Sequence, residues 1–415
     1  MGNRITKANT INVETEKAQS IDASVSFETL TPLPTPLGSS QCVTYKNEIL
    51  ICGGLGTRDC YSYHLHKNEY KLICSYPKNI ELLGHCVVKL VNNNTNDITL
   101  LSFGGRTKHA LTMSYMSIWK GDDETEISIK KTKHCNKWIP LTDNDNNPIQ
   151  IGEHGDIYQG ARALIGGSNN HLLFISHYPM SIAVFDLNTF QFIKRDILPI
   201  SKDNWIRYHC FASKSTSWPS IINDNKRIYE MLLFYKNSGL LIGYDEGNNA
   251  FTFHDMRVCT TIRSVVSYGY TCINDFILLF GGDDDSKPGF SNQVYKYSMS
   301  EKQWMKFEQT LPISLSDCTA VLSNDGTYVH ILGGFDGEKK LSIHIKTKVN
   351  KWMNETEIEK QWIIHEEEKK CIEEIKAELH DMKGDFAIKK LKVESTFKQL
   401  NNKMLNKCKI NFVIT

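Results

Sequence analysis

Three groups of residues have types and spacings that could support chemistry: the run Asp283-Asp284-Asp285, the alternating pair His64 and His66, and 12 cysteines. Neighbouring carboxylates can hold a divalent cation, but a calcium loop needs further oxygen ligands at set spacings, which this segment lacks. We therefore expect a solvated acidic loop. His64 and His66 would share one face of a strand, and without a third ligand nearby we expect them at the surface or packed between sheets.

The cysteines indicate a reducing compartment rather than a disulfide framework or a metal site. The sequence has no Cys-x-x-Cys pair, and several cysteines lie in apolar runs, where a thiol packs as a small hydrophobic group. These are Cys42, Cys52, Cys86, Cys272 and Cys318. Met1 to Ser20 lacks the apolar run of a signal peptide, and no stretch of roughly 18 apolar residues could span a bilayer. These features predict a cytoplasmic protein.

Motifs of the common catalytic sites are missing from the sequence. It contains no Gly-x-x-x-x-Gly-Lys-Ser/Thr phosphate loop, no His-Glu-x-x-His zinc site and no Gly-x-Ser-x-Gly nucleophile elbow. Charge is nearly balanced, with 48 Lys and Arg against 47 Asp and Glu, so composition does not favour nucleic acid as a partner. We predict no catalytic residue, no metal and no cofactor, and hence no enzyme.

The strongest signal in the chain is an internal repeat. In four segments an apolar run ends in two glycines, and a polar loop, an alternating strand and an aromatic segment follow. The four runs are Ile49–Gly54, Leu100–Gly105, Ile277–Gly282 and Val329–Gly334, and Trp138, Trp304 and Trp352 come after the last three. A further strand precedes each run, so each unit offers four short strands bounded by turn residues.

Two weaker units fill the gap between the second and third diglycine runs. One contains the apolar run His171–Ile175, with Ser176-His177 in place of the glycines. The other contains Met231–Phe234, with Tyr235-Lys236 in that place. Six units therefore lie between Gln41 and Met353.

These repeats resemble the kelch family, and Gly333-Gly334-Phe335-Asp336-Gly337 is the best match to its motif. The resemblance implies an all-β fold, a six-bladed β-propeller in which each repeat forms one four-stranded antiparallel blade around a central channel. Ubiquitin-ligase adaptors of that family usually carry a BTB or F-box domain. The residues before Gln41 leave no room for one, so a stand-alone kelch protein is the expectation.

The propeller is predicted to span residues 25–353, between a flexible tail at 1–24 and a charged helical segment at 354–415. Phe27–Pro34 resembles Phe307–Pro312, which links one unit to the next. We therefore predict that Val25–Leu30 adds a strand to the last blade and closes the ring. Met1–Thr6 also fits the N-myristoylation pattern, with Gly2 as the acceptor, but a single acyl chain binds a membrane only marginally.

The segment after Met353 has the composition of a helix, with one glycine and no proline between Asn354 and Cys408. A first apolar stripe is predicted, with a break near Gly384: Ile358, Trp362, Ile372, Ile375, Leu379 and Met382. A second, nearly heptad stripe consists of Phe386, Val393, Phe397, Leu400 and Met404. The first half is acidic and the second basic. An antiparallel helical hairpin, a solvated helix and self-association as a coiled coil all stay open.

The loops after the glycine pairs are the candidate binding surface, because a rigid ring presents its loops for recognition. Arginine and aromatic side chains dominate protein interfaces. The partner-binding candidates are Arg58, Arg106, Lys108, Asp283, Asp284, Phe335 and Asp336.

We predict a non-catalytic, protein-binding scaffold or adaptor. The kelch resemblance implies cytoskeletal or ubiquitin-pathway partners, and the oligomeric state stays open. One alternative is an adaptor tethered to a membrane through Gly2. Another is a copper enzyme resembling galactose oxidase, which would need tyrosine and histidine copper ligands that the sequence does not identify.

Overall fold

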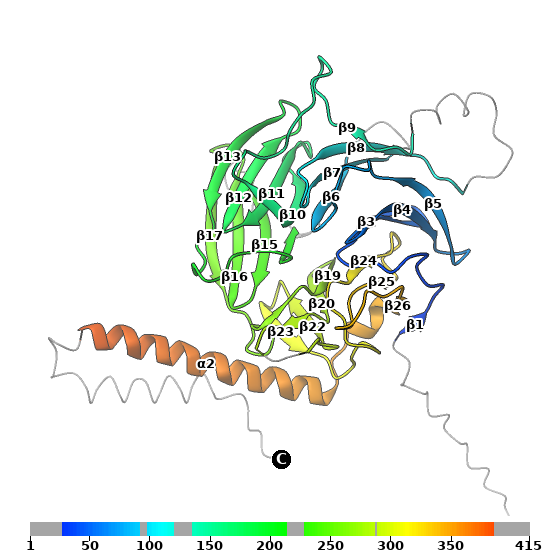
Figure 1. The fold of residues 1–415 in the computed structure, drawn as a ribbon. Helices are drawn as coiled ribbons and strands as arrows, with labels where there is room; N and C mark the ends of the chain where they lie inside the picture. The colour runs from blue at the N-terminus through cyan, green and yellow to red at the C-terminus, as the bar shows by residue number, and fades with distance from the viewer. Residues whose placement is uncertain (1–26, 92–97, 120–134, 214–227, 287–288, 386–415) are drawn as a thin grey trace, which may run out of the picture.

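The computed structural model describes residues 27–91, 98–119, 135–213, 228–286 and 289–385. Six four-stranded antiparallel sheets form the blades of a ring, which confirms the six-bladed β-propeller (Figure 1). The first three blades are β2 (Gln41–Tyr45), β3 (Glu48–Gly54), β4 (Thr57–His64) and β5 (Glu69–Ser75); β6 (His85–Leu90), β7 (Ile98–Gly104), β8 (Ala110–Tyr115) and β9 (Ile139–Pro140); and β10 (Ile157–Gly166), β11 (Leu172–Tyr178), β12 (Ser181–Asp186) and β13 (Gln191–Ile197).

The other three blades follow the same order from the inner strand to the outer one. They are β14 (Cys210–Ser213), β15 (Ile228–Tyr235), β16 (Ser238–Asp245) and β17 (Ala250–Met256); β19 (Gly269–Ile273), β20 (Phe276–Phe280), β22 (Val294–Ser298) and β23 (Gln303–Lys306); and β24 (Thr319–Leu322), β25 (Tyr328–Leu332), β26 (His344–Lys348) and β1 (Glu28–Thr29). A small extra ladder pairs β18 (Val265–Val266) with β21 (Asp283–Asp284).

Neighbouring blades bury each other's faces. Every residue of β3 and of β20 is buried, because each blade has a sheet on both sides and its second strand cannot alternate between core and solvent. The inner strands line up around the axis, where β2 contacts β6 and β24, and β10 contacts β6 and β14. Because both faces of a blade are covered, its strands must be apolar at nearly every position, and the sequence therefore shows near-continuous apolar runs.

The repeated tryptophans fill the spaces between blades. Trp304 of blade 5 packs 4.9 Å from Phe234 of blade 4, and Trp138 stacks on Tyr76 at 4.6 Å. Burying one such ring stabilises the fold by about 2–3 kcal/mol. Trp352 is fully buried too, but it lies in a 3-10 helix, η1 (Val349–Trp352), and not in an outer strand.

The sixth blade differs from the predicted pattern because the N-terminal segment occupies its outer edge. β1 pairs antiparallel with β26 through Glu28↔Lys346 and Thr29↔Ile345. The third strand of this blade is His344–Lys348, slightly later than the predicted Leu341–His344. The predicted closure is confirmed for Glu28–Thr29, and Figure 1 shows β1 beside β26, while Val25 and Ser26 lie outside the described residues.

The glycine pairs are explained by the way each blade holds the connection to the next. Gly281 and Gly333 have left-handed φ values of +66° and +59°, and a Cβ there would lie 2.2 Å and 2.5 Å from a carbonyl oxygen of the adjoining connection. The second glycine donates its N–H to that connection: Gly282 to the Leu315 carbonyl and Gly334 to the Leu37 carbonyl, both at 2.7 Å. The diglycine is thus an inter-blade joint, where any larger residue would clash.

The C-terminal helix α2 (Glu357–Asp385) lies along the outside of the ring beside β22 and β23 (Figure 1). Its described residues end at Asp385, so the break predicted near Gly384 falls at the limit of the described residues and stays a prediction. The predicted apolar stripe docks only in part: Trp362 packs against the core of blades 4 and 5, but Ile358, Ile372 and Leu379 are 63%, 51% and 40% exposed. Residues 386–415, which contain the second predicted stripe, lie outside the described residues.

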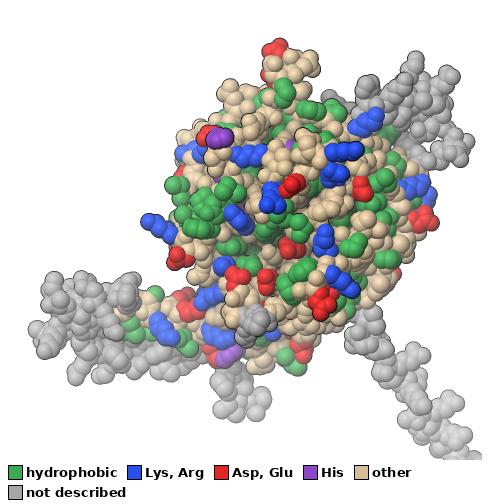
Figure 2. Space-filling view, viewed as in Figure 1, with side chains coloured by type: hydrophobic (Ala, Val, Ile, Leu, Met, Phe, Trp, Pro, Cys, Tyr) green, Lys and Arg blue, Asp and Glu red, His purple; other side chains and the backbone are tan. Residues whose placement is uncertain are grey.

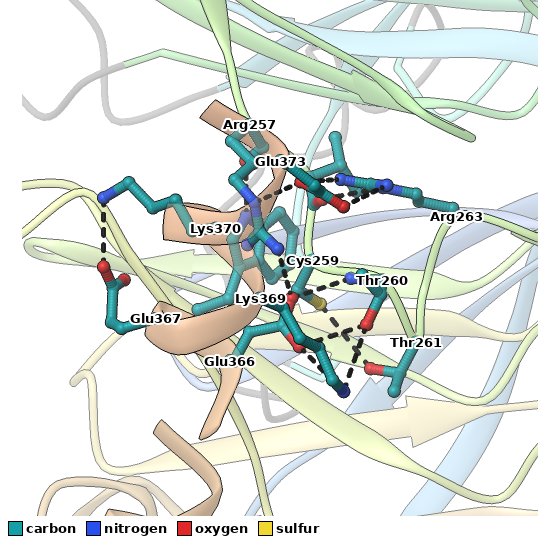
Figure 3. A network of polar contacts seen from close by, with 12 residues as sticks. Arg257, Cys259, Thr260, Thr261, Arg263, Glu366, Glu367, Lys369, Lys370 and Glu373 are labelled. Atoms are coloured by element: carbon teal, nitrogen blue, oxygen red, sulfur yellow. Dashed lines mark hydrogen bonds and ion pairs between the residues drawn. The ribbon is translucent and has the colours of Figure 1, made fainter. Parts of the chain in front are cut away.

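An acidic stripe supplies further docking contacts. Glu359, Glu366 and Glu373 recur every seven residues and so share one helix face, and the first two are each only 3% exposed. Glu366 accepts hydrogen bonds from Arg257 and from the Thr260 N–H (Figure 3). Glu373 accepts from Arg257 and binds Arg263 in a bidentate pair at 2.8 and 2.9 Å. Carboxylates dock this helix because the ring surface beneath it carries arginines and an open backbone N–H.

Candidate functional site

All the predicted loop residues lie on one face of the ring. Because the strands of a blade alternate in direction, the turn between the second and third strands emerges on the same side as the connection to the next blade. We call this side the diglycine face. Its turns are 55–56, 105–109, 179–180, 236–237, 281–293 and 333–343, and its connections are 30–40, 76–84, 141–156, 198–209, 257–268 and 307–318.

Cationic side chains of the first two blades contact the blade-to-blade connections on this face. Arg58 donates to the Lys78 carbonyl at 2.6 Å, and Arg106 lies 3.6 Å from the Glu81 carboxylate. Lys108 donates to the carbonyls of Glu153 and His154 at 2.6 and 3.0 Å. Each of the three therefore ties a turn to a blade-to-blade connection. Arg106, with 67% of its side chain exposed, is open to a partner.

The acidic segment of blade 5 is also built into this face. Asp283 and Asp284 form β21, and the Asp284 carboxylate accepts from the Ser286 side chain at 2.6 Å. Burial, followed by the neighbouring Asp285 and Asp284 charges, raises the pKa of Asp283. Asp285 pairs with Lys236 of the preceding blade at 2.7 Å. Among the residues that the structure describes, no cluster of three or more His, Cys, Asp and Glu could hold a metal.

Phe335 and Asp336 shape a turn of the sixth blade. The half-buried Phe335 bridges to Ser316 and Lys340 through its backbone, and its ring lies 5.7 Å from Phe290. Asp336 accepts the backbone N–H groups of Glu338 and Lys339, each at 2.9 Å, and these bonds lower the pKa of its carboxyl. The candidates of blades 5, 6, 1 and 2 thus share an arc of the ring, but they do not converge on one pocket.

The paired histidines lie at the other end of their strand. His64 ends β4, and its Nδ1 accepts the N–H groups of His66 and Lys67 at 3.3 Å. Its ring packs 5.2 Å from Trp119, so the structure uses His64 to close a turn against an aromatic side chain.

A cluster that the sequence analysis missed lies on the diglycine face at blade 3. Trp205 is 54% exposed, and its ring lies 5.4 Å from that of Tyr178. The Arg207 guanidinium lies 4.5 Å from the same Tyr178 ring. Ile197, which pairs with Ser181 just after the Tyr178 turn, is 69% exposed. We call these four residues, Tyr178, Ile197, Trp205 and Arg207, the Trp205 patch.

The loop around Trp205 is rigid on both sides. Asn204 is only 7% exposed and donates to the Asn237 and Ser238 side chains, while Ile206 is fully buried and donates its N–H to the Pro179 carbonyl at 2.9 Å. Two inward-facing neighbours therefore hold Trp205 outward. A sequence signal was available, because Trp205 stands in a polar connection and not at the repeat position where the other tryptophans close a unit.

The central channel opens on this face through a ring of backbone bends. One residue at the start of each inner strand has a left-handed φ between +51° and +77°: Ser39, Gly84, Gly160, Tyr208, Ser267 and Asp317. Backbone bonds of 2.8 Å join them from blade to blade in two arcs. In the first arc the Tyr208 N–H donates to the Gly160 carbonyl, and the Gly160 N–H donates to the Gly84 carbonyl. In the second arc the Ser39 N–H donates to the Asp317 carbonyl, and the Asp317 N–H donates to the Ser267 carbonyl. The mouth of the channel is therefore fixed by main-chain geometry.

Behind this mouth is a cavity of about 310 Å³ lined by all six inner strands or the residues just before them. Arg162 and Asp317 are the charged residues of its described lining, and most of the rest carry hydroxyl, thiol or small apolar groups. Tyr208 lies across the mouth, since a Cβ on Gly84 would come within 2.8 Å of its hydroxyl. The sequence offered no direct signal for this site, because its residues come from every repeat.

Electrostatics place Arg162 close to the channel axis. Burial lowers the pKa of His209 and raises those of Cys86 and Tyr270, and the Arg162 charge acts on all three from a different blade. Burial likewise raises the pKa of Asp317, and the Ser39 hydroxyl and the Arg162 charge offset part of that rise. The Arg162 charge therefore acts on titratable groups that several blades contribute around the cavity.

The face seen in Figure 2 carries basic and acidic side chains interspersed with hydrophobic ones, with no large patch of one sign. None of the described helices is both long enough and apolar enough to cross a bilayer. Gly2 lies outside the described residues.

No protein-family model matches the chain, and no curated protein matches it. The chain is similar in structure to many solved structures, of which two are described. One, described as "Structure of YjhT", shares 13% sequence identity over 76% of this chain and 95% of that chain, with a TM-score of 0.49. The other, from the "Crystal Structure of Mitotic Checkpoint Complex", shares 9% identity over 83% of this chain and 99% of that chain, with a TM-score of 0.42. The fold assignment above rests on the six sheets themselves.

Proposed function

We propose that this protein is a non-catalytic scaffold that binds a protein partner through the Trp205 patch on the diglycine face. The observation that carries the proposal is the outward Trp205 side chain, 54% exposed between two buried neighbours. A large aromatic side chain that is already fixed in place loses little conformational entropy on binding. Tryptophan, tyrosine and arginine are also the residue types that contribute most at protein interfaces.

The surroundings of the patch suit this role. Arg207 and Tyr178 flank Trp205 with a cation and a second ring, and Ile197 adds apolar surface at the adjoining strand end. The more distant candidates Arg58 and Arg106 belong to blades 1 and 2 and lie outside the patch, so the proposal does not place them in the contact with the partner. We further propose that the repeats are kelch repeats, with partners of the cytoskeletal or ubiquitin-pathway classes that the resemblance implies.

The test compares partner enrichment by wild type, Trp205→Ala and Arg207→Glu, with Arg58→Glu as a control on the same face. Proteins captured from cells by proximity labelling would be quantified by mass spectrometry, and the direct binder would then be titrated. We expect the two patch variants to weaken binding about 30-fold or more, which corresponds to a hot spot of about 2 kcal/mol.

Thermal unfolding serves as the folding control. Trp205 is exposed, so its variant should melt within about 2 °C of wild type, the scale expected for a surface substitution. Equal enrichment of every partner by the wild type and both patch variants would place the binding surface elsewhere on the ring.

A further inference from the structure

We infer that the central channel is a binding site for a small organic anion, with Arg162 as the residue that recognises its carboxylate or phosphate group. This site is separate from the Trp205 patch, and the proposal does not depend on a protein partner.

The first argument is that Arg162 has no ion-pair partner in the part of the chain that the structure describes; its guanidinium lies 5.9 Å from the Tyr208 ring. Its Nε donates to the His209 carbonyl at 3.2 Å and its Nη1 to the Ala161 carbonyl at 3.3 Å. Among the described residues, no carboxylate lies within ion-pairing distance of this guanidinium. Arg162 is partly buried, and an arginine that is withdrawn from water is usually paired with a carboxylate. The two carbonyls orient the guanidinium without neutralising it.

The second argument is contrast within the same molecule. Arg257 and Arg263, which serve a structural purpose, are saturated by the Glu366 and Glu373 carboxylates at 2.8 Å. Arg195 is likewise paired with Asp156 at 3.1 Å. Arg162, which lines the channel cavity, has no such carboxylate partner among the described residues and keeps N–H donors for a group that enters the cavity.

The third argument is the shape and chemistry of the cavity. Its volume of about 310 Å³ is at the small end of the range of about 300–1,000 Å³ for small-molecule sites. Thr271 and Thr319 place hydroxyl groups among its walls, while Ala163 and Phe211 provide apolar surface. A compact ligand with one charged group and several hydroxyl groups fits this lining.

Asp317 restricts the ligand further. Its carboxylate accepts from the Ser39 hydroxyl at 2.9 Å at the mouth, so a second anionic group there would be repelled. A hydroxyl group of the ligand could donate to the same carboxylate. The lining therefore favours a ligand with a single anionic group directed at Arg162 and neutral donors directed at Asp317.

The experiment uses the full chain and three probes with the same carbon skeleton: glycerate, glycerol 3-phosphate and glycerol. Binding is measured by isothermal titration and by thermal shift at constant ionic strength, with sodium chloride as the salt control. We expect saturable binding of glycerate, glycerol 3-phosphate or both, and none of glycerol. The preferred anion then identifies the group that the site recognises.

Two variants locate the site. Arg162→Gln should weaken binding of the preferred anion about 10- to 100-fold, as expected for the loss of one charge-assisted contact. Arg106→Gln, an exposed cation on the same face, should leave it unchanged. If Arg162→Gln does not fold, Ala163→Leu keeps the charge and fills the cavity, and it should abolish binding.

Three results would overturn the proposal. They are no saturable binding of either anion by wild type, equal binding of glycerol, and undiminished binding by the folded Arg162 or Ala163 variant. Loss of partner binding in the Trp205 variants with anion binding intact would confirm that the two sites are independent.

Discussion

Removing the Glu366 carboxylate is expected to release α2 from the propeller. The Glu366 side chain is only 4% exposed, and it accepts from Arg257 at 2.8 Å and from the Thr260 N–H and hydroxyl at 2.9 and 3.1 Å (Figure 3). In Glu366→Ala both partners lose their acceptor while α2 still covers them. Leaving these groups unsatisfied costs more than the lost attraction alone.

The magnitude follows from the partners that remain. Breaking a buried ion pair costs about 3–5 kcal/mol, but Arg257 is 20% exposed and keeps its bond to Glu373, so we expect about 2–4 kcal/mol. That corresponds to a roughly 30- to 1,000-fold larger population of detached helix. The loss in global stability cannot exceed the free energy of docking, because α2 can separate while the ring stays folded.

Hydrogen exchange of the backbone amides of residues 362–373 reports this detachment directly. Glu366→Ala should lose protection there, with protection in β3 and β20 unchanged. Glu366→Gln, which keeps an acceptor for Thr260, should lose less. The control is Glu367→Gln, because Glu367 pairs with Lys370 on the same helix, at 3.1 Å, and not with a described residue of the ring. Unchanged exchange in Glu366→Ala, or an equal effect of Glu367→Gln, would refute this account of docking.

The same contact predicts a pH dependence. Burial alone would raise the pKa of Glu366, but the Thr260 N–H, the Arg257 hydrogen bond and the Arg257 charge outweigh it, so the pKa is lowered. A lowered folded-state pKa means that the stabilisation is complete above the unfolded-state value of about 4.3 and is lost as the pH falls below it. Helix protection should therefore be constant from neutral pH to about 5 and decline in more acidic solution.

Three further predictions concern the ring. Trp352→Ala should cost about 3–5 kcal/mol in the free energy of unfolding measured with urea, because this fully buried indole contacts the rings of Phe27 and Phe307. Gly333→Ala should cost about 3 kcal/mol, since the new methyl would meet a carbonyl at 2.5 Å; Gly326→Ala, with a similar φ of +71° but open space, should cost only about 1 kcal/mol. Burial raises the pKa of the Cys86 thiol to about 11, so peptide mass spectrometry should show at least about 100-fold slower alkylation in the folded protein than in urea at pH 8.

The propeller could be predicted from the sequence because its packing rules act within each repeat. An apolar second strand and a glycine pair are separate local needs that recur in the four blades with the same joint, and a buried tryptophan follows in three of them. Blades 3 and 4 lack the glycines because other contacts hold their connections. The Tyr268 hydroxyl, for example, donates to the Phe234 carbonyl at 2.9 Å. Even there, strand periodicity placed the units correctly.

The docking face of α2 could not be predicted in the same way. Helical periodicity identifies which residues share a face, but the choice between the apolar stripe and the acidic one depends on what the ring offers. Trp362 packs against the core of blades 4 and 5, whereas Arg257 and Arg263 select Glu366 and Glu373. Those arginines are more than a hundred residues away in the sequence, so no local pattern connects them to the helix.

The candidates predicted from the loops next to the glycine pairs differ from Trp205 and Arg162, which the structure brings forward, and the repeat itself explains the difference. Residues next to a repeated motif are held by the contacts that make the motif repeat, as Lys108 and Asp336 are, so their polar groups are already occupied. A residue available for binding must break the repeat. Trp205 stands outside the repeated tryptophan position, and Arg162 places a charge on an inner strand, in a cavity whose described lining has Asp317 as its other charged residue. In a repeat protein, the positions where one unit departs from the others at a cost to its own stability are therefore the best guide to function.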